Sequence, residues 1–379
     1  MSYPAPILNL NFANAKQLGD KVAFSRASVA LRRAFNGNNV PIRAGMAIFD
    51  HSAEGASLGL RPESSATNRV VSCRDMTQAA WACSGCTPAL NATGIDGVAN
   101  SASTLAANTS NATALQSITL VSGARCYSVH VKRKIGTGKI YITLDGGATW
   151  TDITANLSTS SYYRAYVTAT VTNPQFGVKI ETSGDAVYLD FHQLEDGTFP
   201  SSGILTTTAA VTRAADVASV DLTKLVGTGG EPLWTGTEGT IVVDAIVPPV
   251  VNPVNYQRLI SLDDGTSENR VTLSRSPSNG KLGIGNVVAG ASVFSQYAAA
   301  ASENSSRIRV VIAVNRTEYA WALNGSLEGS ASAANGTMGG SLKIGCGYDG
   351  TFQWGGTIRS VQLYNRRIAD AYLPALSAL

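Results

Sequence analysis

The sequence contains little charge. Only 15% of its 379 residues are Asp, Glu, Lys or Arg, whereas soluble domains average about 25%. A disordered chain combines low hydrophobicity with high net charge, but here 44% of the residues are hydrophobic and the formal net charge is +3. The composition therefore excludes a disordered protein, and uncharged polar residues such as Ser, Thr and Asn must cover much of its surface.

Long apolar runs and basic clusters are also missing. The strand-length apolar segment 240–247 is closed by Pro248 and Pro249, far short of the roughly 18 residues that a membrane helix requires. The first residues show no basic and apolar signal-peptide pattern. The nearest basic cluster, 131–134, lies in an alternating segment, as expected for a solvated strand. We therefore expect no membrane insertion and no nucleic-acid partner.

Cysteine and histidine are few. The five cysteines include a C-x-x-C at Cys83 and Cys86 without the second pair that a structural zinc site requires. Buried or loop thiols, a local disulfide and metal ligation all stay open for this pair. None of the histidines, His51, His130 and His192, lies beside a G-x-S-x-G nucleophile elbow. The sequence therefore predicts a protein that is not an enzyme and that has no cofactor.

What the chain does contain is alternating β-type sequence. Segments such as 125–132, 139–144 and 186–194 alternate apolar and polar residues, and turn residues separate them, as in antiparallel sandwiches. About eight further segments of the same kind follow between 223 and 379, enough for a jelly roll. We predict an all-β chain of two antiparallel β-sandwich domains after an irregular N-terminal segment. Its parts are the docking segment 1–70, a sandwich at 71–200, a linker at 201–222 and a jelly roll at 223–379.

Two motifs bear on catalysis. Residues 143–150, TLDGGATW, match the Asp-box pattern, in which the Asp carboxylate caps a tight hairpin turn. It occurs once, so we interpret it as a stabilised hairpin.

The carboxylates of Asp263, Asp264 and Glu268 lie close together in sequence and are a weak candidate for a calcium site, because hard cations bind clustered carboxylates. Solvated acids at turns are the ordinary alternative.

Three parts of the sequence together resemble a set of modules found in virion proteins of tailed bacteriophages. They are 24–28 (FSRAS) with 58–68, 193–200 (QLEDGTFP) with 210–218, and 356–370, which looks like the closing strand and helix of a concanavalin A-like, or laminin-G-like, jelly roll. Arg61 and Pro62 stand where the phage pattern has apolar residues. The resemblance covers nearly the whole chain and carries no defined catalytic residues.

This resemblance implies a structural protein on the virion surface, assembled in the bacterial host cytoplasm. It implies a sandwich like a carbohydrate-binding module followed by a lectin-like one, and attachment to other virion proteins through residues 1–70. A tail-fibre or receptor-binding role in host adhesion is our first expectation, with a homo-oligomer, such as a trimer, as the assembled form. A capsid decoration protein, head fibre or baseplate component with only protein contacts is the alternative, and a polysaccharide depolymerase is a third.

Glycan binding requires a flat apolar ring for the sugar face and polar groups for its hydroxyls. In the second sandwich these groups occur together near expected loops. The candidates are Trp354, Tyr348, Asp349, Trp321 and Asn324. The alternation around Trp321 also fits a core position, so that both interpretations stay open for it. The identity of the glycan and the oxidation state of the C-x-x-C pair are likewise open.

Overall fold

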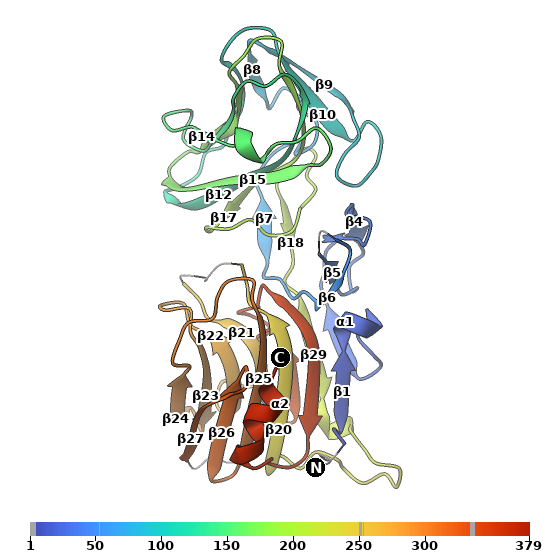
Figure 1. Cartoon of the computed structure of the whole chain (residues 1–379), viewed down its shortest axis with the longest axis vertical. Helices are drawn as coiled ribbons and strands as arrows, with labels where there is room; N and C mark the ends of the chain where they lie inside the picture. Colours follow the sequence, from blue (N-terminus) through green and yellow to red (C-terminus); the bar gives the residue numbers. More distant parts are fainter. Residues whose placement is uncertain (1–4, 53, 250–251, 253, 334–337) are drawn as a thin grey trace.

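The computed structural model of the chain describes residues 5–52, 54–249, 252, 254–333 and 338–379. It consists almost entirely of antiparallel strands arranged in two β-sandwiches, one above the other in Figure 1. The predicted all-β class is thus confirmed. The described helices are short: α1 (Phe12–Ala15), α2 (Leu373–Ser377) and the 3-10 turns η1 (Thr154–Asn156), η2 (Leu222–Lys224) and η3 (Asp370–Tyr372).

The larger unit, here called the main sandwich, packs two sheets face to face. Sheet A has the strand order β27-β26-β25-β20-β29-β6-β5, and β1 also pairs with β29. Sheet B has the order β2-β19-β28-β21-β22-β23-β24. The strands of sheet A are β1 (Leu8–Asn11), β5 (Phe49–His51), β6 (Ser57–Leu60), β20 (Glu238–Ile246), β25 (Arg307–Asn315), β26 (Glu318–Leu323), β27 (Ser326–Ser332) and β29 (Thr357–Tyr364). Those of sheet B are β2 (Val22–Ser25), β19 (Val217–Asp221), β21 (Gln257–Asp263), β22 (Arg270–Arg275), β23 (Leu282–Val288), β24 (Ala291–Tyr297) and β28 (Ser341–Ile344).

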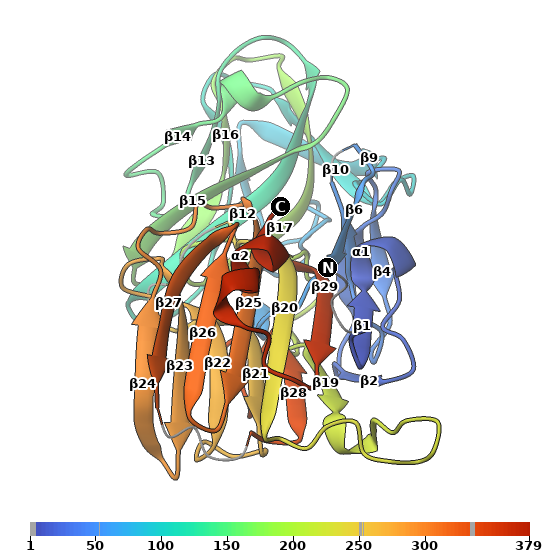
Figure 2. The ribbon, with the colours of Figure 1, turned by 60° about the horizontal axis from the view of Figure 1, so that its bottom comes forward.

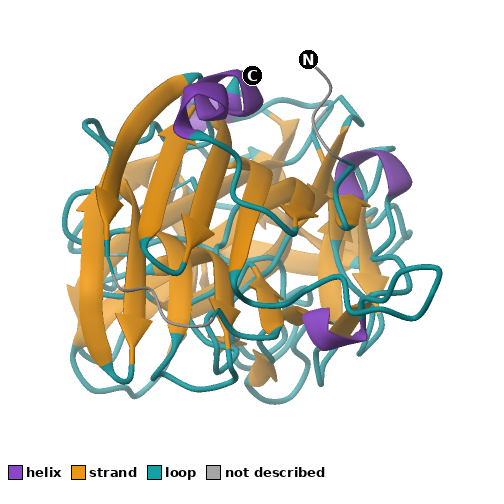
Figure 3. Ribbon diagram, turned by 90° about the horizontal axis from the view of Figure 1, so that it is seen from below, coloured by secondary structure: helices purple, strands orange, loops and turns teal. Residues whose placement is uncertain are grey.

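The two faces of sheet A are covered differently. Alternate side chains of β20, such as Ile241 and Val243, point into the core between the sheets. Their neighbour Val242 points outward, where the C-terminal segment with α2 lies over the sheet (Figure 3). A second apolar layer is therefore buried outside sheet A. It comprises Val242, Val311, Ala313, Ala320, Ala322, Tyr364, Ile368, Leu373 and Leu376.

The first 70 residues are not irregular, as the sequence suggested, but belong largely to the main sandwich. Strand β1 pairs antiparallel with β29, and β2 pairs with β19. Leu8, Phe12 and Leu60 lie in the core between the sheets. These strands have only three or four residues, which is too short for an alternating pattern to stand out. Whether this segment also attaches to a virion stays a prediction.

The second unit, here called the inserted domain, interrupts the main sandwich between β6 and β19. It packs two five-stranded sheets around a separate core that includes Tyr127 and Phe176. The first sheet contains β9 (Cys86–Ala92), β10 (Ala102–Ala107), β12 (Gly123–Ile135), β15 (Tyr163–Val171) and β17 (Ala186–Asp196). The second contains β8 (Ala82–Ser84), β11 (Ala112–Ser117), β13 (Ile140–Thr143), β14 (Thr151–Asp152) and β16 (Gln175–Ile180). The residues 223–379 thus form only part of their sandwich.

Two paired strands connect the units (Figure 1), and Figure 2 shows the main sandwich in front of the inserted domain. Strand β7 (Ala66–Asn68) leads out of the main sandwich and β18 (Val211–Arg213) leads back, with Asn68 opposite Val211. Above this ribbon, the amide of Ser72 donates a hydrogen bond of 2.6 Å to the carbonyl of Thr207. The inserted domain therefore begins and ends at adjacent points. Residues 201–222, expected to be a linker, contain both β18 and β19, the latter a strand of sheet B.

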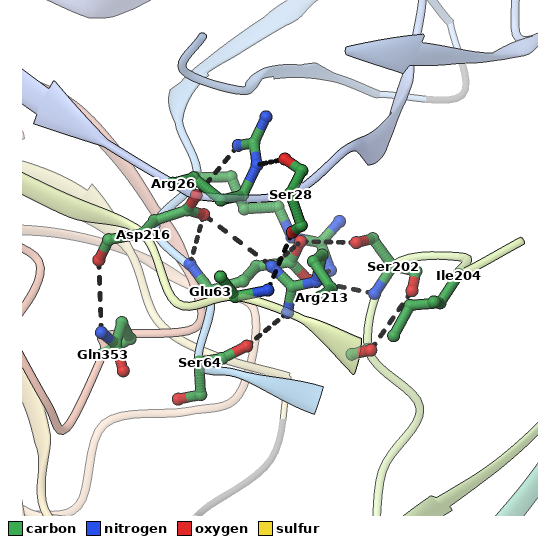
Figure 4. A network of polar contacts seen from close by, with 12 residues as sticks. Arg26, Ser28, Glu63, Ser64, Ser202, Ile204, Arg213, Asp216 and Gln353 are labelled. Carbon is green, nitrogen blue, oxygen red and sulfur yellow. Dashed lines mark hydrogen bonds and ion pairs between the residues drawn. The ribbon is translucent and has the colours of Figure 1, made fainter. Parts of the chain in front are cut away.

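A buried ionic network, here called the junction network, lies where this ribbon meets the main sandwich (Figure 4). The guanidinium of Arg26 binds Asp216 at 2.9 Å, with both side chains at most 1% exposed. Arg213 lies 3.3 Å from the carboxylate of Glu63, which also accepts a 2.6 Å hydrogen bond from Ser202. These residues come from the segments directly after β2 and β6, from β18 and the segment that follows it, and from the end of the inserted domain. The network thus joins the two units by polar contacts.

A small hairpin reaches from the main sandwich to the inserted domain. It is formed by β3 (Ala30–Arg33) and β4 (Asn39–Ile42). Leu31 packs into the core of the inserted domain, and the amide of Asn39 donates a 2.8 Å hydrogen bond to the carbonyl of Ile95. This hairpin is therefore a third contact between the units, separate from the paired strands.

Candidate binding groove on sheet B

The two tryptophans expected to bind sugar are buried in the structure. Trp321 and Trp354 are both 0% exposed and lie in the core of the main sandwich. The indole N–H of Trp321 donates to the side chain of Gln296, and that of Trp354 donates to the carbonyl of Ile246. A ring enclosed on both sides has no face to offer a ligand, so the prediction that they are glycan platforms is wrong.

The other predicted residues lie in different places. Asn324 is in the hairpin turn between β26 and β27 of sheet A, where its side-chain oxygen accepts a hydrogen bond from the amide of Arg309. Asp349 caps the loop after β28 by accepting from the amide and the hydroxyl of Thr351. Both side chains therefore stabilise turns. Tyr348 differs, because it lines a cavity beside sheet B.

The carboxylates proposed for calcium do not converge on one point. Asp263 is buried and accepts hydrogen bonds from Ser261 and Gly265. Asp264 accepts from Thr266 and Asn269 instead. Among the described residues, no group of three or more Asp, Glu, His or Cys side chains could hold a metal ion. Asp263, Asp264 and Glu268 therefore do not form such a group. The weak calcium candidate is therefore not supported, because turn capping already occupies the oxygens of Asp263 and Asp264.

A groove is present on the outer face of sheet B, the face without a covering helix. Two cavities of about 160 and 210 Å³ adjoin there and share Arg258, Arg270 and Thr272. We call them together the sheet B groove. They run over β21, β22, β23 and β24 to the loop after β28. Their remaining lining is Tyr256, Ser261, Ser267, Ser274, Gly283, Ile284, Gly285, Asn286, Val287, Ser292, Ser295, Tyr297, Gly347, Tyr348 and Phe352.

Small residues form the floor of the groove. Thr272 on β22 lies opposite Gly285 on β23, and Ser274 lies opposite Gly283. A Cβ at Gly283 would lie 2.5 Å from the ring of Tyr297, so only glycine allows this tyrosine to lie against the strand. A Cβ at Gly285 would come no closer than 3.5 Å to Thr272. Space above the floor is therefore open at Gly285.

Aromatic rings form the rim of the groove. Tyr256 and Tyr297 lie 3.0 Å apart at their hydroxyls and are 36% and 37% exposed. Phe352 is also 37% exposed, and Tyr348 is half-buried beside it. Sequence reasoning found only Tyr348. Tyr256 and Tyr297 stand at the start and end of strands, where a sequence does not reveal that two rings will meet.

Two arginines provide the charge. The guanidinium of Arg258 donates a 3.2 Å hydrogen bond to Ser274 and lies 5.1 Å from the centre of the Tyr256 ring. That of Arg270 donates to the carbonyl of Ser267 and lies 5.6 Å from the Tyr348 ring centre. Burial and the nearby Arg270 lower the pKa of Arg258. No described carboxylate forms an ion pair with either guanidinium, so their remaining N–H groups can serve a ligand.

This arrangement suits binding and not catalysis. Rings offer apolar faces, while serine, threonine and arginine offer hydrogen bonds in fixed positions. Neither cysteine nor histidine lines the groove, and no Asp or Glu is in its lining. The groove therefore contains none of the pairs of carboxylates that glycoside hydrolysis uses.

The remaining motifs serve the inserted domain. The Asp-box interpretation is confirmed, because Asp145 accepts hydrogen bonds from the amide and hydroxyl of Thr149 and from the Thr143 hydroxyl. None of the five cysteines, all described, forms a disulfide. His192 is buried against Tyr127, whose hydroxyl lies 2.8 Å from its Nδ1. Among the described residues, no helix has the length and apolar character for crossing a membrane.

The comparisons with known proteins leave the family open. No protein-family model matches the sequence, and no curated protein matches it. Among solved structures, the CBM40 of the Ruminococcus gnavus IT-sialidase bound to α2,3-sialyllactose has a TM-score of 0.32 and 20% identity, covering 38% of this chain and 83% of that one. The SAP-like pentraxin of Limulus polyphemus has a TM-score of 0.31 and 17% identity, covering 38% and 70%. Domain 4 of the arabinanase AbnA from Geobacillus stearothermophilus, in complex with arabinotriose, has a TM-score of 0.33 and 11% identity, covering 48% and 82%. At these scores the likenesses are too weak to carry an argument.

Proposed function

We propose that the chain binds glycans, without catalysis, through the sheet B groove. The observation that carries this proposal is the asymmetry of the main sandwich. The C-terminal segment covers the outer face of sheet A, whereas the outer face of sheet B is a groove with a polar floor and four aromatic rings at its rim. Such a surface fits the alternating apolar and hydroxyl-bearing faces of a sugar.

We further propose that this binding serves adhesion by a surface protein of a tailed phage, of the tail-fibre or receptor-binding kind. The support is the sequence resemblance of segments 24–28, 193–200 and 356–370 to phage virion proteins. A weak single site becomes effective when many copies act on one particle, since multivalency raises avidity by about 10²–10⁴. A decoration or baseplate component with protein contacts alone is the competing proposal.

The test is glycan binding by the full-length chain. Its purified form is applied, as a multimer on a scaffold, to an array of bacterial surface polysaccharides. Gly285→Val places a branched side chain over the open floor, where its Cβ would come no closer than 3.5 Å to a neighbour. Tyr297→Ala removes a rim ring. We expect either variant to lower the signal at least tenfold at unchanged thermal stability.

Tyr163→Ala is the matched control, because Tyr163 is also 37% exposed but lies on β15 of the inserted domain. The control is expected to bind like the unchanged chain. If no polysaccharide is bound, or if all three variants bind equally, the groove is not a glycan site. Labelling of intact particles then separates adhesion from decoration: label on the capsid shell contradicts a tail-fibre role.

A further inference from the structure

A second hollow lies between the β3–β4 hairpin and the inserted domain. It consists of two cavities of about 530 and 260 Å³ that share Arg33, Asn39, His130 and Arg164. We call it the junction cleft. One wall is the turn of the hairpin, and the other is formed by β12, β15 and the loops that precede β10 and β15. Its larger cavity exceeds both parts of the sheet B groove in volume.

The junction cleft is positively charged. Its larger cavity is lined by Arg33, Lys132 and Arg164 and by no acidic residue. None of these three cations forms an ion pair with a carboxylate of the described chain. The smaller cavity contains Asp50, but this carboxylate already binds Arg61 at 2.8 Å and accepts from the amides of its neighbours. The buried carboxylate of Glu195 offsets part of the charge of Arg164. The cations that line the two cavities still outnumber the single acidic residue in their lining, and such an excess attracts anions.

Arg164 is held in place by the protein. Its guanidinium donates to the carbonyl of Ser201 at 2.6 Å and to the hydroxyl of Ser128 at 3.0 Å. Its Nε is buried without a hydrogen-bond partner among the described residues. Burial lowers the pKa of Arg164. A guanidinium fixed in this way is preorganised for a planar oxyanion.

His130 gives an independent sign of a missing ligand. It lines both cavities, its side chain is 91% buried, and its Nδ1 has no partner in the described chain. A buried polar atom without a hydrogen bond destabilises the fold, and a ligand that supplies the bond removes that cost. Burial, followed by the charges of Arg164 and Arg33, lowers the pKa of His130 well below its usual value. The imidazole is thus neutral at pH 7 and can offer an N–H to a ligand.

The rest of the lining is rich in neutral hydrogen-bonding groups. Asn36, Asn38 and Asn39 come from the hairpin, and Ser160 and Ser161 come from the loop before β15. Tyr162 adds a ring, and its hydroxyl donates to the carbonyl of Thr93 at 2.8 Å. A simple inorganic anion would need few of these groups. A sugar that carries an anionic group would use both the cations and the amides.

We propose that the junction cleft binds an acidic saccharide, whose carboxylate or sulfate lies between Arg33, Lys132 and Arg164 and whose hydroxyls meet the asparagines of the hairpin. This site is separate from the sheet B groove and does not depend on the function proposed for it. Its walls come from both structural units.

The experiment is titration calorimetry on the full-length chain with four probes: a heparin octasaccharide, an oligogalacturonate, a neutral dextran oligosaccharide and inorganic sulfate. Arg33→Glu reverses an exposed charge in the cleft, and within the part of the chain that the structure describes this side chain forms no hydrogen bond or ion pair. Arg43→Glu is the matched control, because Arg43 is also exposed and lies just beyond the same hairpin, outside the cleft lining.

We expect at least one acidic oligosaccharide to bind, with a Kd at least tenfold weaker in Arg33→Glu and unchanged in Arg43→Glu. Gly285→Val should also leave this affinity unchanged, which separates the cleft from the groove. The proposal is overturned if neither acidic oligosaccharide binds, if dextran binds as well as they do, or if both charge reversals weaken binding equally. Binding of sulfate alone, or tighter binding of a single-stranded oligonucleotide added as a competitor, overturns the assignment to a saccharide.

Discussion

At the residue scale, Glu63 shows how charge is accommodated at the centre of the molecule. Burial alone would raise its pKa, but the guanidinium groups of Arg213 and Arg61 and hydrogen bonds from Ser202 lower it to about 2. The carboxylate is therefore stabilised in its charged form by the fold. A single group of this kind contributes on the order of 3 kcal/mol to folding while it is ionised.

The sign of the resulting pH dependence follows from the lowered pKa. Stability contributed by Glu63 is fully present above its unfolded pKa of about 4.5 and is lost as pH falls toward 2. We expect Glu63→Gln to destabilise the chain at pH 7, and the difference from the unchanged chain to shrink between pH 4.5 and pH 2. Urea unfolding at pH 7, 4.5 and 2.5 measures this. A difference that is constant over the range would contradict the ionic role.

The thiols differ in reactivity for a similar local reason. A hydrogen bond from Cys86 lowers the pKa of Cys83 to about 7, whereas burial raises the pKa of Cys73 and Cys126. Since the thiolate is the nucleophile, iodoacetamide at pH 7 should modify Cys83 first in the native protein. In Cys86→Ala, which removes the donor, this modification should slow several-fold, as measured by mass spectrometry over time. Equal rates for Cys83 and Cys73 would refute the assignment.

The sequence predicted few of the site residues, because the type of a residue does not show whether its side chain faces the core or the open side of a sheet. Trp321 and Trp354 have the chemistry of a sugar platform, yet each points into the core. Tyr348 was found because loops are usually exposed. Tyr256 and Tyr297 were missed since their contact joins strands 41 residues apart in sequence.

At the element scale, the C-terminal segment decides which sheet face is open. Ile368, Leu373 and Leu376 cover the outer side of β20, β25 and β26. The four-residue spacing of Ile368, Tyr372 and Leu376 predicts a helix here. The structure has a 3-10 turn followed by the short α2, with Tyr372 38% exposed. The helix is short because Pro374 at its first turn fits only a helix start.

Removing residues 368–379 tests this role. Three apolar side chains would no longer be buried against sheet A. Burial of each contributes about 1.5–3 kcal/mol, so the free energy of unfolding should fall by roughly 5 kcal/mol. We expect the truncated chain to unfold at a lower temperature and to bind the dye ANS, because Val311 and Ala322 become exposed. A triple variant with Ser at the three positions is the milder control. Unchanged melting in both would contradict the covering role.

The strands were predicted well where apolar alternation is strong, as in β12, β17, β20 and β29. The strands β24 and β27 were missed because both lie at sheet edges, where none of their residues is fully buried. Hydrogen bonds to a neighbouring strand hold these two strands in place, and the sequence of the strand itself does not show that pairing. A sequence shows the buried faces of strands more clearly than exposed edges.

At the scale of the whole molecule, the sequence suggested domains in series, while the structure places one inside the other. The pairing of β1 with β29 joins residues about 350 positions apart, and no local sequence pattern predicts such a pairing. The core of the main sandwich accordingly draws on Leu8 and Val22 as well as on the strands after 217.

This organisation predicts which pieces fold. Replacing residues 69–210 by Asn-Gly would turn β7 and β18 into an ordinary two-residue hairpin, since Asn68 lies opposite Val211. We expect that shortened chain to unfold cooperatively, as followed by circular dichroism. The fragment 223–379 lacks β1, β2, β5, β6 and β19 and should aggregate or stay unfolded. Cooperative unfolding of that fragment would show that the added strands are dispensable.

The paired strands β7 and β18 also have a mechanical consequence. A domain on a single flexible linker can swivel about its bonds, but two hydrogen-bonded strands about 4.8 Å apart resist torsion and bend mainly in one plane. Any tension on the inserted domain is shared by both strands, and their hydrogen bonds run across that tension. The inserted domain is thus held along two load paths, and the β3–β4 hairpin and the junction network brace it against tilting.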